Sequence, residues 1–373
     1  MMAMVVIPVL ICGMILLTRR VERQAARPLG AALLITALSM CPQIIGFAGG
    51  YAIWPWLTYF PLFFMDLWLG PLMMVHAHRL MSSDPLGWKA WLFLPGAVQF
   101  LYNLIAFTSL GDGPLDHEAK FAFTRAVHLP YIVPVESVLG MALIGLAIIV
   151  IWRQRSRYLI FLEQTQSAAR DYDPVWIRNF IIALAICGAL WIGQESAHLI
   201  FAMSYGTAFP YLVLIMCVIA WLAMDAAWRL TDAFPKMSGI VMTPAAPALD
   251  RNLFGRIDQA VSDGNWYLEP RLSVRDIAKR LGSNESYVSR AINQTTGMSF
   301  NNWVNRARVE RAKTLLIDAP SMSILAIAME SGFNSKATFN RVFRDIAGRT
   351  PSQFRHRSSP GDTPVRRVSS QNP

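Results

Sequence analysis

The chain has 373 residues, of which 54% are hydrophobic and only 16% are charged, and its formal net charge is +10. A soluble domain carries about 25% charged residues, so this composition excludes a chain that is soluble along its whole length. Residues 231–373 hold 20 Lys and Arg against 12 Asp and Glu, whereas residues 1–230 hold 14 against 12. The apolar part and the basic part are therefore predicted to be separate domains, and the basic one suits a polyanion such as nucleic acid or anionic lipid.

Seven apolar stretches within residues 1–230 are long enough to cross a bilayer, which takes roughly 20 mostly apolar residues. They lie at about 2–18, 29–49, 57–78, 89–110, 130–152, 177–202 and 209–229. The loops on one side of these stretches carry eleven Lys and Arg, and the loops on the other side carry two. Because positive charge concentrates in cytoplasmic loops, the N-terminus is predicted outside and the C-terminus in the cytoplasm.

Five polar side chains fall inside the predicted spans, where their cost in hydrocarbon requires a reason. They are Asp66, Asn103, Glu136, Glu195 and His198. Glu195 and His198 are three residues apart and therefore share a helix face. One interpretation is an outward-facing pocket for a small polar or cationic ligand, and the other is hydrogen bonding that only joins helices of the bundle. Both interpretations stay open at this point.

Neither a catalytic centre nor a metal or cofactor site is predicted. A single Glu-x-x-His is not a di-iron bundle, which needs a second such motif and further carboxylates. The cysteines lie far apart in apolar runs, so we expect small buried side chains rather than disulfides or metal ligands. They are Cys12, Cys41, Cys187 and Cys217.

Two segments have no helical pattern. Residues 231–250 contain three prolines, which predicts a semi-extended linker. Residues 358–373 are rich in Ser and Pro and poor in apolar residues, which predicts a disordered tail. The expected domains are therefore a membrane domain at 1–230, the linker at 231–250, a basic domain at 251–357 and the tail.

The basic domain shows short amphipathic helices with clear start and stop signals. Ser273 and Asp276 form a capping box, and Gly282 ends the helix that they open. A longer helix is expected at about 299–317. The other helices are predicted to open at Ser283 or Asn284, at Ser323, at Asn334 or Ser335, and at Thr350.

An internal repeat runs through this domain. "IAKRLG" leads to "SYVSRAI" at residues 277–292, and "IAMESGF" leads to "ATFNRVF" at residues 327–343. Each copy has Ile-Ala on a first helix, a glycine at the turn, and two apolar residues four apart on a second helix. That spacing places the apolar pair on one face, so each copy predicts a helix-turn-helix unit. Two units joined by a stiff helix suit two successive major-groove faces, about 34 Å apart.

The residues from "LSVRDIAKRLG" to "RVERAKTLL", followed by "SILAIAMESGF" through "G-x-TPSQFR", resemble the DNA-binding domain of the AraC/XylS family of bacterial transcription regulators. The resemblance covers about 255–357. It implies that the second helix of each unit enters the major groove. The residues placed to contact base edges are then Ser286, Ser289, Arg290, Lys336, Thr338, Asn340 and Arg341.

Four other arginines of this domain are expected to contact phosphates or to support the fold: Arg306, Arg308, Arg344 and Arg355. The expected partners are double-stranded promoter DNA, RNA polymerase, the lipid bilayer and an unidentified small ligand. Two DNA-reading units in one chain allow a homodimer without requiring one.

Together these features predict an all-α protein, with a seven-helix membrane bundle and a cytoplasmic domain of two helix-turn-helix units. The leading interpretation is a multi-pass protein of the bacterial inner membrane that regulates transcription by sequence-specific DNA binding and senses an external or membrane signal. The main alternative is a membrane enzyme or transporter that carries an autoregulatory DNA-binding domain. A third interpretation makes the spans a passive anchor.

Overall fold

The computed structural model describes residues 2–47, 53–54, 57, 59–85, 87–112, 116–172, 175–201, 217–219, 221, 235–237 and 252–358. Every regular element in these ranges is helical, as the all-α fold class predicts. The chain divides into two compact units, Met1–Tyr158 with Pro174–Gly239, and Leu159–Asp173 with Ile240–Pro373. The C-terminal unit thus includes a stretch, 159–173, that the sequence analysis placed in the membrane domain.

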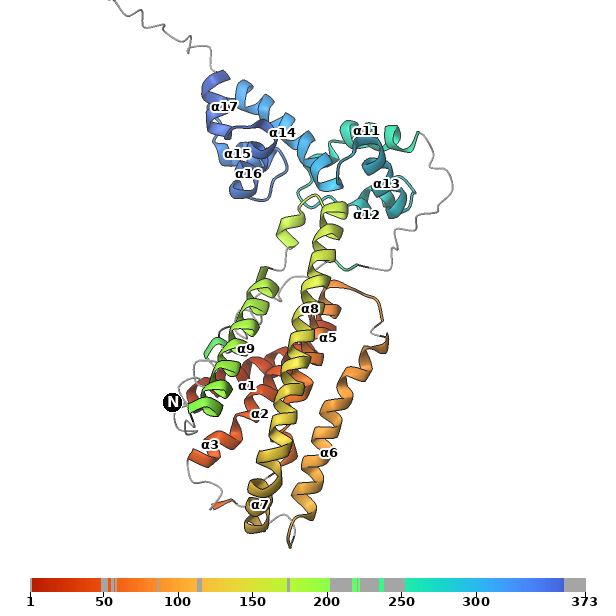
Figure 1. The fold of residues 1–373 in the computed structure, drawn as a ribbon. Helices are drawn as coiled ribbons and strands as arrows, with labels where there is room; N and C mark the ends of the chain where they lie inside the picture. Colours follow the sequence, from red (N-terminus) through yellow and green to blue (C-terminus); the bar gives the residue numbers. More distant parts are fainter. Residues whose placement is uncertain are drawn as a thin grey trace, which may run out of the picture. The chain divides into compact units, whose positions relative to one another are not determined.

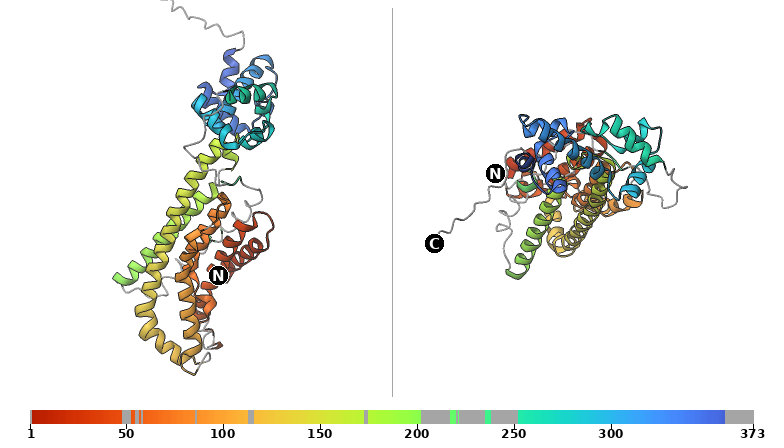
Figure 2. Two further views of the ribbon diagram at one scale, coloured as in Figure 1. Left: turned by 90° about the vertical axis from the view of Figure 1, so that its right-hand side faces the viewer. Right: turned by 90° about the horizontal axis from the view of Figure 1, so that it is seen from above.

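In the N-terminal unit, α2 packs against both α1 and α5, and α6 runs beside α8 (Figures 1 and 2). Short 3₁₀ turns and one π-helical segment, Thr124–Ile132, connect some of the helices. The helices are α1 (Met2–Thr18), α2 (Arg23–Ser39), α3 (Cys41–Phe47), α5 (Leu69–Met81), α6 (Leu94–Ser109), α7 (His117–Phe123), α8 (Val133–Thr165) and α9 (Val175–Phe201).

Two helical stretches in the described part of the chain are long and apolar enough to cross a membrane, Ala90–Ser109 and His117–Thr165. They contain the predicted spans 89–110 and 130–152 almost entirely. The predicted spans 2–18 and 177–202 coincide with α1 and α9, but their described apolar parts, Val6–Thr18 and Ile177–Leu190, are shorter. The predicted span 209–229 lies outside the described residues, except for 217–219 and 221.

Two predicted spans are interrupted. The span predicted at 29–49 is divided into α2, which ends at Ser39, and α3, which begins at Cys41. Pro42 lies in the first turn of α3, where a missing N–H breaks no hydrogen bond of the helix. The span predicted at 57–78 begins with 3₁₀ turns at Pro61–Phe63 and Asp66–Trp68 before α5.

The helix that starts as α7 continues through the π-helical segment into α8. Pro130 lies within this segment, where the wider turn accommodates a residue that cannot donate a backbone hydrogen bond. The continuous helix is about 70 Å long, against about 30 Å for the hydrocarbon core of a bilayer. It therefore extends well beyond the predicted span and ends in the C-terminal unit.

Residues 235–237, which the sequence places in the linker, are bound to the N-terminal unit. The N–H of Met237 donates to the carbonyl of Met81 at 2.9 Å, and the carbonyl of Met237 accepts from the N–H of Ser83 at 3.0 Å. Tyr158 Oη donates to the carbonyl of Pro235 at 2.7 Å, and Lys236 Nζ lies 2.7 Å from a carboxylate oxygen of Glu22. Residues 231–234 and 238–250 lie outside the described residues.

The cysteines behave differently from one another. Cys12 is buried and Cys41 is partly buried, both as free thiols, whereas Cys217 is exposed. The expectation of a buried side chain is therefore wrong for Cys217, because an apolar run has an outward face as well as a packed one. The side chain of Cys187 lies outside the described residues.

The C-terminal unit is built from helices that follow the predicted starts closely. Its stretch 159–173 holds the last turns of α8 and a 3₁₀ turn, Ala169–Tyr172. The other elements are α11 (Leu253–Asp263), a 3₁₀ turn at Trp266–Leu268, α12 (Val274–Arg280), α13 (Glu285–Thr296), α14 (Phe300–Asp318), α15 (Ile324–Glu330), α16 (Lys336–Ala347) and α17 (Pro351–Ser358).

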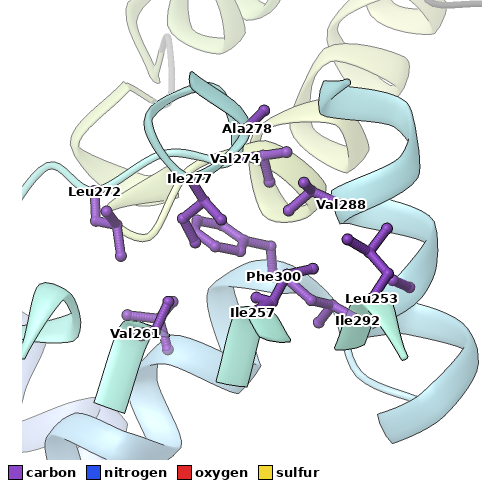
Figure 3. Packing of buried hydrophobic residues seen from close by; sticks show 12 residues of the cluster. Leu253, Ile257, Val261, Leu272, Val274, Ile277, Ala278, Val288, Ile292 and Phe300 are labelled. Atoms are coloured by element: carbon purple, nitrogen blue, oxygen red, sulfur yellow. The ribbon is translucent and has the colours of Figure 1, made fainter. Parts of the chain in front are cut away.

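Two hydrophobic cores lie in this unit, one for each helix-turn-helix. Figure 3 shows the first, where Phe300 of α14 packs among Ile257, Ile277 and Ile292 from α11, α12 and α13. The second core contains Val309 and Leu316 of α14 together with side chains of α15 and α16. Because α14 contributes to both cores, it joins the two halves through a rigid helix.

The turn glycines of the two helix-turn-helix units differ in their surroundings. Gly332 has a φ of +83°, and a Cβ there would lie 2.8 Å from the carbonyl oxygen of Leu268. Gly282 has a φ of +61°, but a Cβ there would meet nothing within 4 Å. The second turn therefore has to accommodate neighbouring backbone as well as a left-handed conformation.

We expect Gly282→Ala to cost about 1 kcal/mol, from the left-handed backbone alone. Gly332→Ala should cost about 3 kcal/mol, because the backbone of Leu268 must also move. Hydrogen–deuterium exchange of the α13 and α16 amides in the full-length protein measures both losses. Equal losses for the two variants would contradict the close approach at Gly332.

Candidate nucleic-acid interface

The first helix-turn-helix is held by side-chain caps at both helix starts. Ser273 accepts from the N–H of Asp276, and Asp276 accepts from the N–H of Ser273 at 2.9 Å, which confirms the predicted capping box. Asn284 Oδ1 accepts from the N–H of Ser286 at 2.8 Å at the start of α13. Val288 and Ile292 of α13 are fully buried, so their spacing sets which face of the helix is exposed.

The second helix-turn-helix repeats this construction. Ser323 caps α15, and Ser335 caps α16 through the N–H of Thr338 at 3.2 Å. Phe339 and Phe343, at the positions of Val288 and Ile292, are also fully buried. The two units therefore present equivalent faces of α13 and α16, as the repeat in the sequence predicts.

An ion pair joins the two helices of the first unit, and another joins α12 to the preceding turn. Arg275 Nε lies 2.9 Å from Glu285 Oε1, and this contact raises the pKa of Arg275. Arg280 binds both carboxylate oxygens of Glu269 at 2.7 and 2.8 Å, which raises the pKa of Arg280. Both pairs are largely exposed, so each stabilises the fold by less than about 1 kcal/mol.

The candidate base-contacting residues of α13 lie on its partly exposed side. Ser286, Ser289 and Arg290 are each half-buried. Ser289 Oγ donates to the carbonyl of Gln164 at 3.4 Å, so part of this surface is already covered.

The candidates on α16 occupy the matching side of the second unit. Lys336 is exposed at the first turn, and Asn340 is half-buried. The hydroxyl of Thr338 lies 3.0 Å from that of Ser335 and so takes part in the cap. Arg341 Nη1 lies 3.4 Å from Asp345 Oδ2, one turn further along the helix. Arg341 and Asn340 correspond by repeat to Arg290 and Ser289.

Arg308 lies deep inside the unit, with 2% of its surface exposed. Its Nε donates to the carbonyl of Tyr267 at 2.6 Å, and its Nη2 donates to the carbonyl of Glu269 at 2.7 Å and to Ser167 Oγ at 3.1 Å. Burial lowers the pKa of Arg308 to about 10, and the charge of Asp171 opposes that shift. Of its two expected roles, Arg308 therefore has the structural one.

The other three arginines that were expected to contact phosphates or support the fold differ in how exposed they are. Arg355 donates to the carbonyls of Pro320 and Met322, the latter at 2.7 Å, which makes it a support of the α14–α15 connection. Arg306 and Arg344 are exposed and stay available for phosphate contact.

One group of contacts in this unit was not predicted. Asn301 Nδ2 of α14 donates to the carbonyls of Gln166 and Ser167 at 3.2 and 2.6 Å. Asn334 Nδ2 donates to Asp171 Oδ2. The sequence offers no local signal for these contacts, because the partners are more than a hundred residues apart in the chain.

The polar candidates of the N-terminal unit are brought together in part. Gln99 Nε2 donates to Asp66 Oδ1 at 2.9 Å, and Glu136 interacts with both of these side chains. Asn103 is fully buried and donates to the carbonyl of Gln99 at 2.9 Å, and among the described residues its Oδ1 has no hydrogen-bond partner. Asp66, Asn103 and Glu136 thus gather around Gln99.

Glu195 and His198 lie in α9, but their side chains fall outside the described residues. The hydrogen bonds around Gln99 join the 3₁₀ turn at Asp66–Trp68 to α6, as the helix-joining interpretation expects. The unpartnered Asn103 Oδ1 leaves the ligand interpretation in place.

We expect Arg308→Met to destabilise the C-terminal unit by about 3 kcal/mol, because three buried acceptors lose their donor. Arg306→Met, two residues away and exposed, should change stability by less than about 0.5 kcal/mol. Thermal unfolding of the two full-length variants measures the difference. If Arg308→Met instead kept normal stability and bound DNA less tightly, the side chain would be a phosphate contact.

Comparison with known proteins identifies relatives of this domain. A family model described as "Helix-turn-helix domain" matches residues 277–357. An uncharacterized HTH-type transcriptional regulator of Staphylococcus aureus is 34% identical over 110 residues, which cover 30% of this chain and 14% of that protein. The Msm operon regulatory protein of Streptococcus mutans is 33% identical over 84 residues, covering 22% of this chain and 30% of that protein. The chain therefore spans less than a third of either relative.

Among solved structures, the C-terminal domain of the two-component response regulator yesN from Fusobacterium nucleatum is 23% identical. It covers 28% of this chain and 98% of that domain, with a TM-score of 0.26. Both relatives are named as regulators, one of transcription and one of an operon. The chain carries at its C-terminus an AraC-type helix-turn-helix domain of the kind found in bacterial DNA-binding transcription regulators.

Proposed function

We propose that the chain is a membrane-anchored transcription regulator that binds promoter DNA in a sequence-specific way and carries a sensor in its N-terminal unit. The observation that carries the DNA-binding half is the repeated geometry of α13 and α16. Both helices have a capped start, a buried apolar pair and an arginine at the same position, Arg290 and Arg341. Each bidentate contact to a base discriminates by about 1–3 kcal/mol.

The membrane half of the proposal rests on apolar surface that the described residues leave uncovered. The most apolar windows of Ala90–Ser109 and His117–Thr165 have mean hydropathies of 1.5 and 2.3, yet only 22% and 17% of them are buried. Val98, Leu101, Val135 and Val138 are all more than half exposed. The core helix of a soluble protein would be mostly buried, so lipid is the fitting environment for these faces. Multi-pass insertion, with the N-terminus outside, extends this proposal to the other predicted spans.

The sensing role rests on the polar group around Gln99, in which Gln99 and Asn103 are buried and Asp66 and Glu136 are partly buried. Gln99 donates to Asp66, the carboxylate of Glu136 interacts with both, and among the described residues Asn103 Oδ1 has no hydrogen-bond partner. Such groups in a membrane are costly and are retained for a ligand, a proton or a specific helix contact. A small polar or cationic ligand is the proposed stimulus, with RNA polymerase as the partner on the output side and a homodimer allowed.

One experiment tests both halves. Cells that lack the gene are complemented with the wild-type chain, with Arg290→Ala/Arg341→Ala, or with a chimera in which an unrelated membrane anchor replaces residues 1–158, so that the stretch 159–173 of the C-terminal unit is kept. Transcriptomes are compared across growth conditions in which the wild-type pattern changes. The double variant should reproduce the deletion pattern, because the loss of two base contacts lowers affinity at least about 30-fold. The chimera should give a pattern that no longer changes with conditions.

A double variant that restores the wild-type pattern would contradict DNA reading by α13 and α16. A chimera that still responds as the wild type does would show that the N-terminal unit is a passive anchor. Insertion of each variant is checked by membrane fractionation, so that loss of protein is not mistaken for loss of function.

A further inference from the structure

The segment 164–171, from the last turn of α8 into the 3₁₀ turn at Ala169–Tyr172, lies against the helix-turn-helix domain inside the C-terminal unit. Its backbone pairs with the domain, since the N–H of Ser167 donates to the carbonyl of Leu272 at 3.0 Å. Asn301 of α14 donates to two carbonyls of the segment, and Arg308 donates to Ser167 Oγ. Ser167 is 2% exposed. The segment is therefore seated in the domain, not merely close to it.

The contacts between segment 164–171 and the domain, here called the seat, extend to both predicted DNA-reading helices, α13 and α16. Ser289, a candidate base contact on α13, donates its hydroxyl hydrogen to the carbonyl of Gln164. At the other end of the segment, Asp171 accepts from Asn334, which directly precedes the cap of α16. While Ser289 donates its hydroxyl hydrogen to Gln164, it cannot donate that hydrogen to a base edge, and the backbone at Gln164 lies beside the hydroxyl where a base would have to approach.

The charge at the second contact also matters. Asp171 places a carboxylate at the N-terminus of α16, and helix N-termini are where DNA-binding domains receive backbone phosphates. The carboxylate of Asp171 repels a phosphate there, and it occupies the side-chain N–H of Asn334 that could otherwise donate to the phosphate. The segment thus supplies an anion where DNA would supply one.

We infer that segment 164–171 is an intramolecular occupant of the DNA-reading surface, and that it must leave its seat before α13 and α16 both engage DNA. This inference rests on the proposed DNA-binding function. The seat is made of individually modest hydrogen bonds, several of them to backbone carbonyls, so a change in α8 is enough to displace it. Since α8 is continuous with the apolar helix of the N-terminal unit, the segment is the element through which a stimulus there reaches the DNA reader.

The first test removes hydrogen bonds that the domain donates to the segment, without changing the net charge of the protein. Asn301→Ala deletes both hydrogen bonds to Gln166 and Ser167. Asn302, its exposed neighbour in the same helical turn, makes no side-chain hydrogen bond to the segment within the described part of the chain, so Asn302→Ala serves as the matched control. Full-length proteins in lipid nanodiscs are titrated with a fluorescent pool of random-sequence DNA duplexes. Asn301→Ala should bind at least about fivefold more tightly than the wild type, and Asn302→Ala should match the wild type.

The second test acts from the segment side, because Asn301 also accepts from Asn305 and its loss affects packing. Asp171→Ala removes the contact to Asn334, and Glu163→Ala removes the same charge from an exposed position of the same helix end. If the seat blocks DNA, Asp171→Ala should tighten binding several-fold more than Glu163→Ala. Equal gains for the two variants would reflect only the loss of a negative charge and would overturn the inference.

A third variant keeps the two proposals distinguishable. Arg290→Ala/Arg341→Ala should lose affinity for the duplex pool if α13 and α16 bind DNA at all. If it binds as the wild type does, the proposed function fails. If it loses binding while Asn301→Ala and Asp171→Ala bind no more tightly than their controls, the DNA-binding function stands and the seat is a structural support.

Discussion

The arrangement of the C-terminal unit depends on the burial of one guanidinium group. Arg308 ties together parts of the chain that share no sequence neighbourhood: the turn at Tyr267–Glu269, the helix α14 on which it stands, and Ser167 after α8. Its guanidinium also lies 5.7 Å from the ring centre of Phe333, in the turn of the second helix-turn-helix. A buried charge without the carbonyls of Tyr267 and Glu269 would destabilise the fold, so these two acceptors must stay in place, whereas the single bond to Ser167 Oγ can be given up when segment 164–171 leaves. The placement of the turn at Tyr267–Glu269 against α14 follows from that requirement.

Local features of the sequence were sufficient to predict most of the DNA-binding domain. The capping box at Ser273, the caps at Asn284, Ser323 and Ser335, and the turn glycines act within four residues of themselves, so their outcome does not depend on the rest of the fold. The apolar pairs four apart then determine which face is buried. The sequence was less informative about Arg308, for which phosphate contact and structural support were equally open, because burial is decided by long-range packing.

Most of the features that the sequence did not predict are contacts between distant segments. Residues 235–237 lie in the stretch 231–250, whose three prolines predict a semi-extended linker, yet they pair with the backbone at Met81–Ser83. Segment 164–171 was expected in a cytoplasmic loop, and nothing in its own composition indicates the domain that binds it. In the N-terminal unit, hydropathy located the apolar stretches but not the interruption at Met40 or the length of α8. The candidate polar residues were found because a charge in an apolar run is conspicuous, whereas Gln99, which joins three of them, is less so.

The proposed attachment of the DNA-binding domain to a membrane unit has a specific physical consequence. Such a protein would need no diffusing messenger, because the proposed signal would pass from a helix of the N-terminal unit to the DNA-binding domain along the same chain. The most direct measurement is genome-wide crosslinking of the tagged full-length protein in intact cells, recovered from the membrane fraction, beside the Arg290→Ala/Arg341→Ala variant. The account predicts discrete promoter sites for the wild type that disappear in the double variant. Sites that persist unchanged in the double variant, or a wild-type protein absent from the membrane fraction, would contradict it.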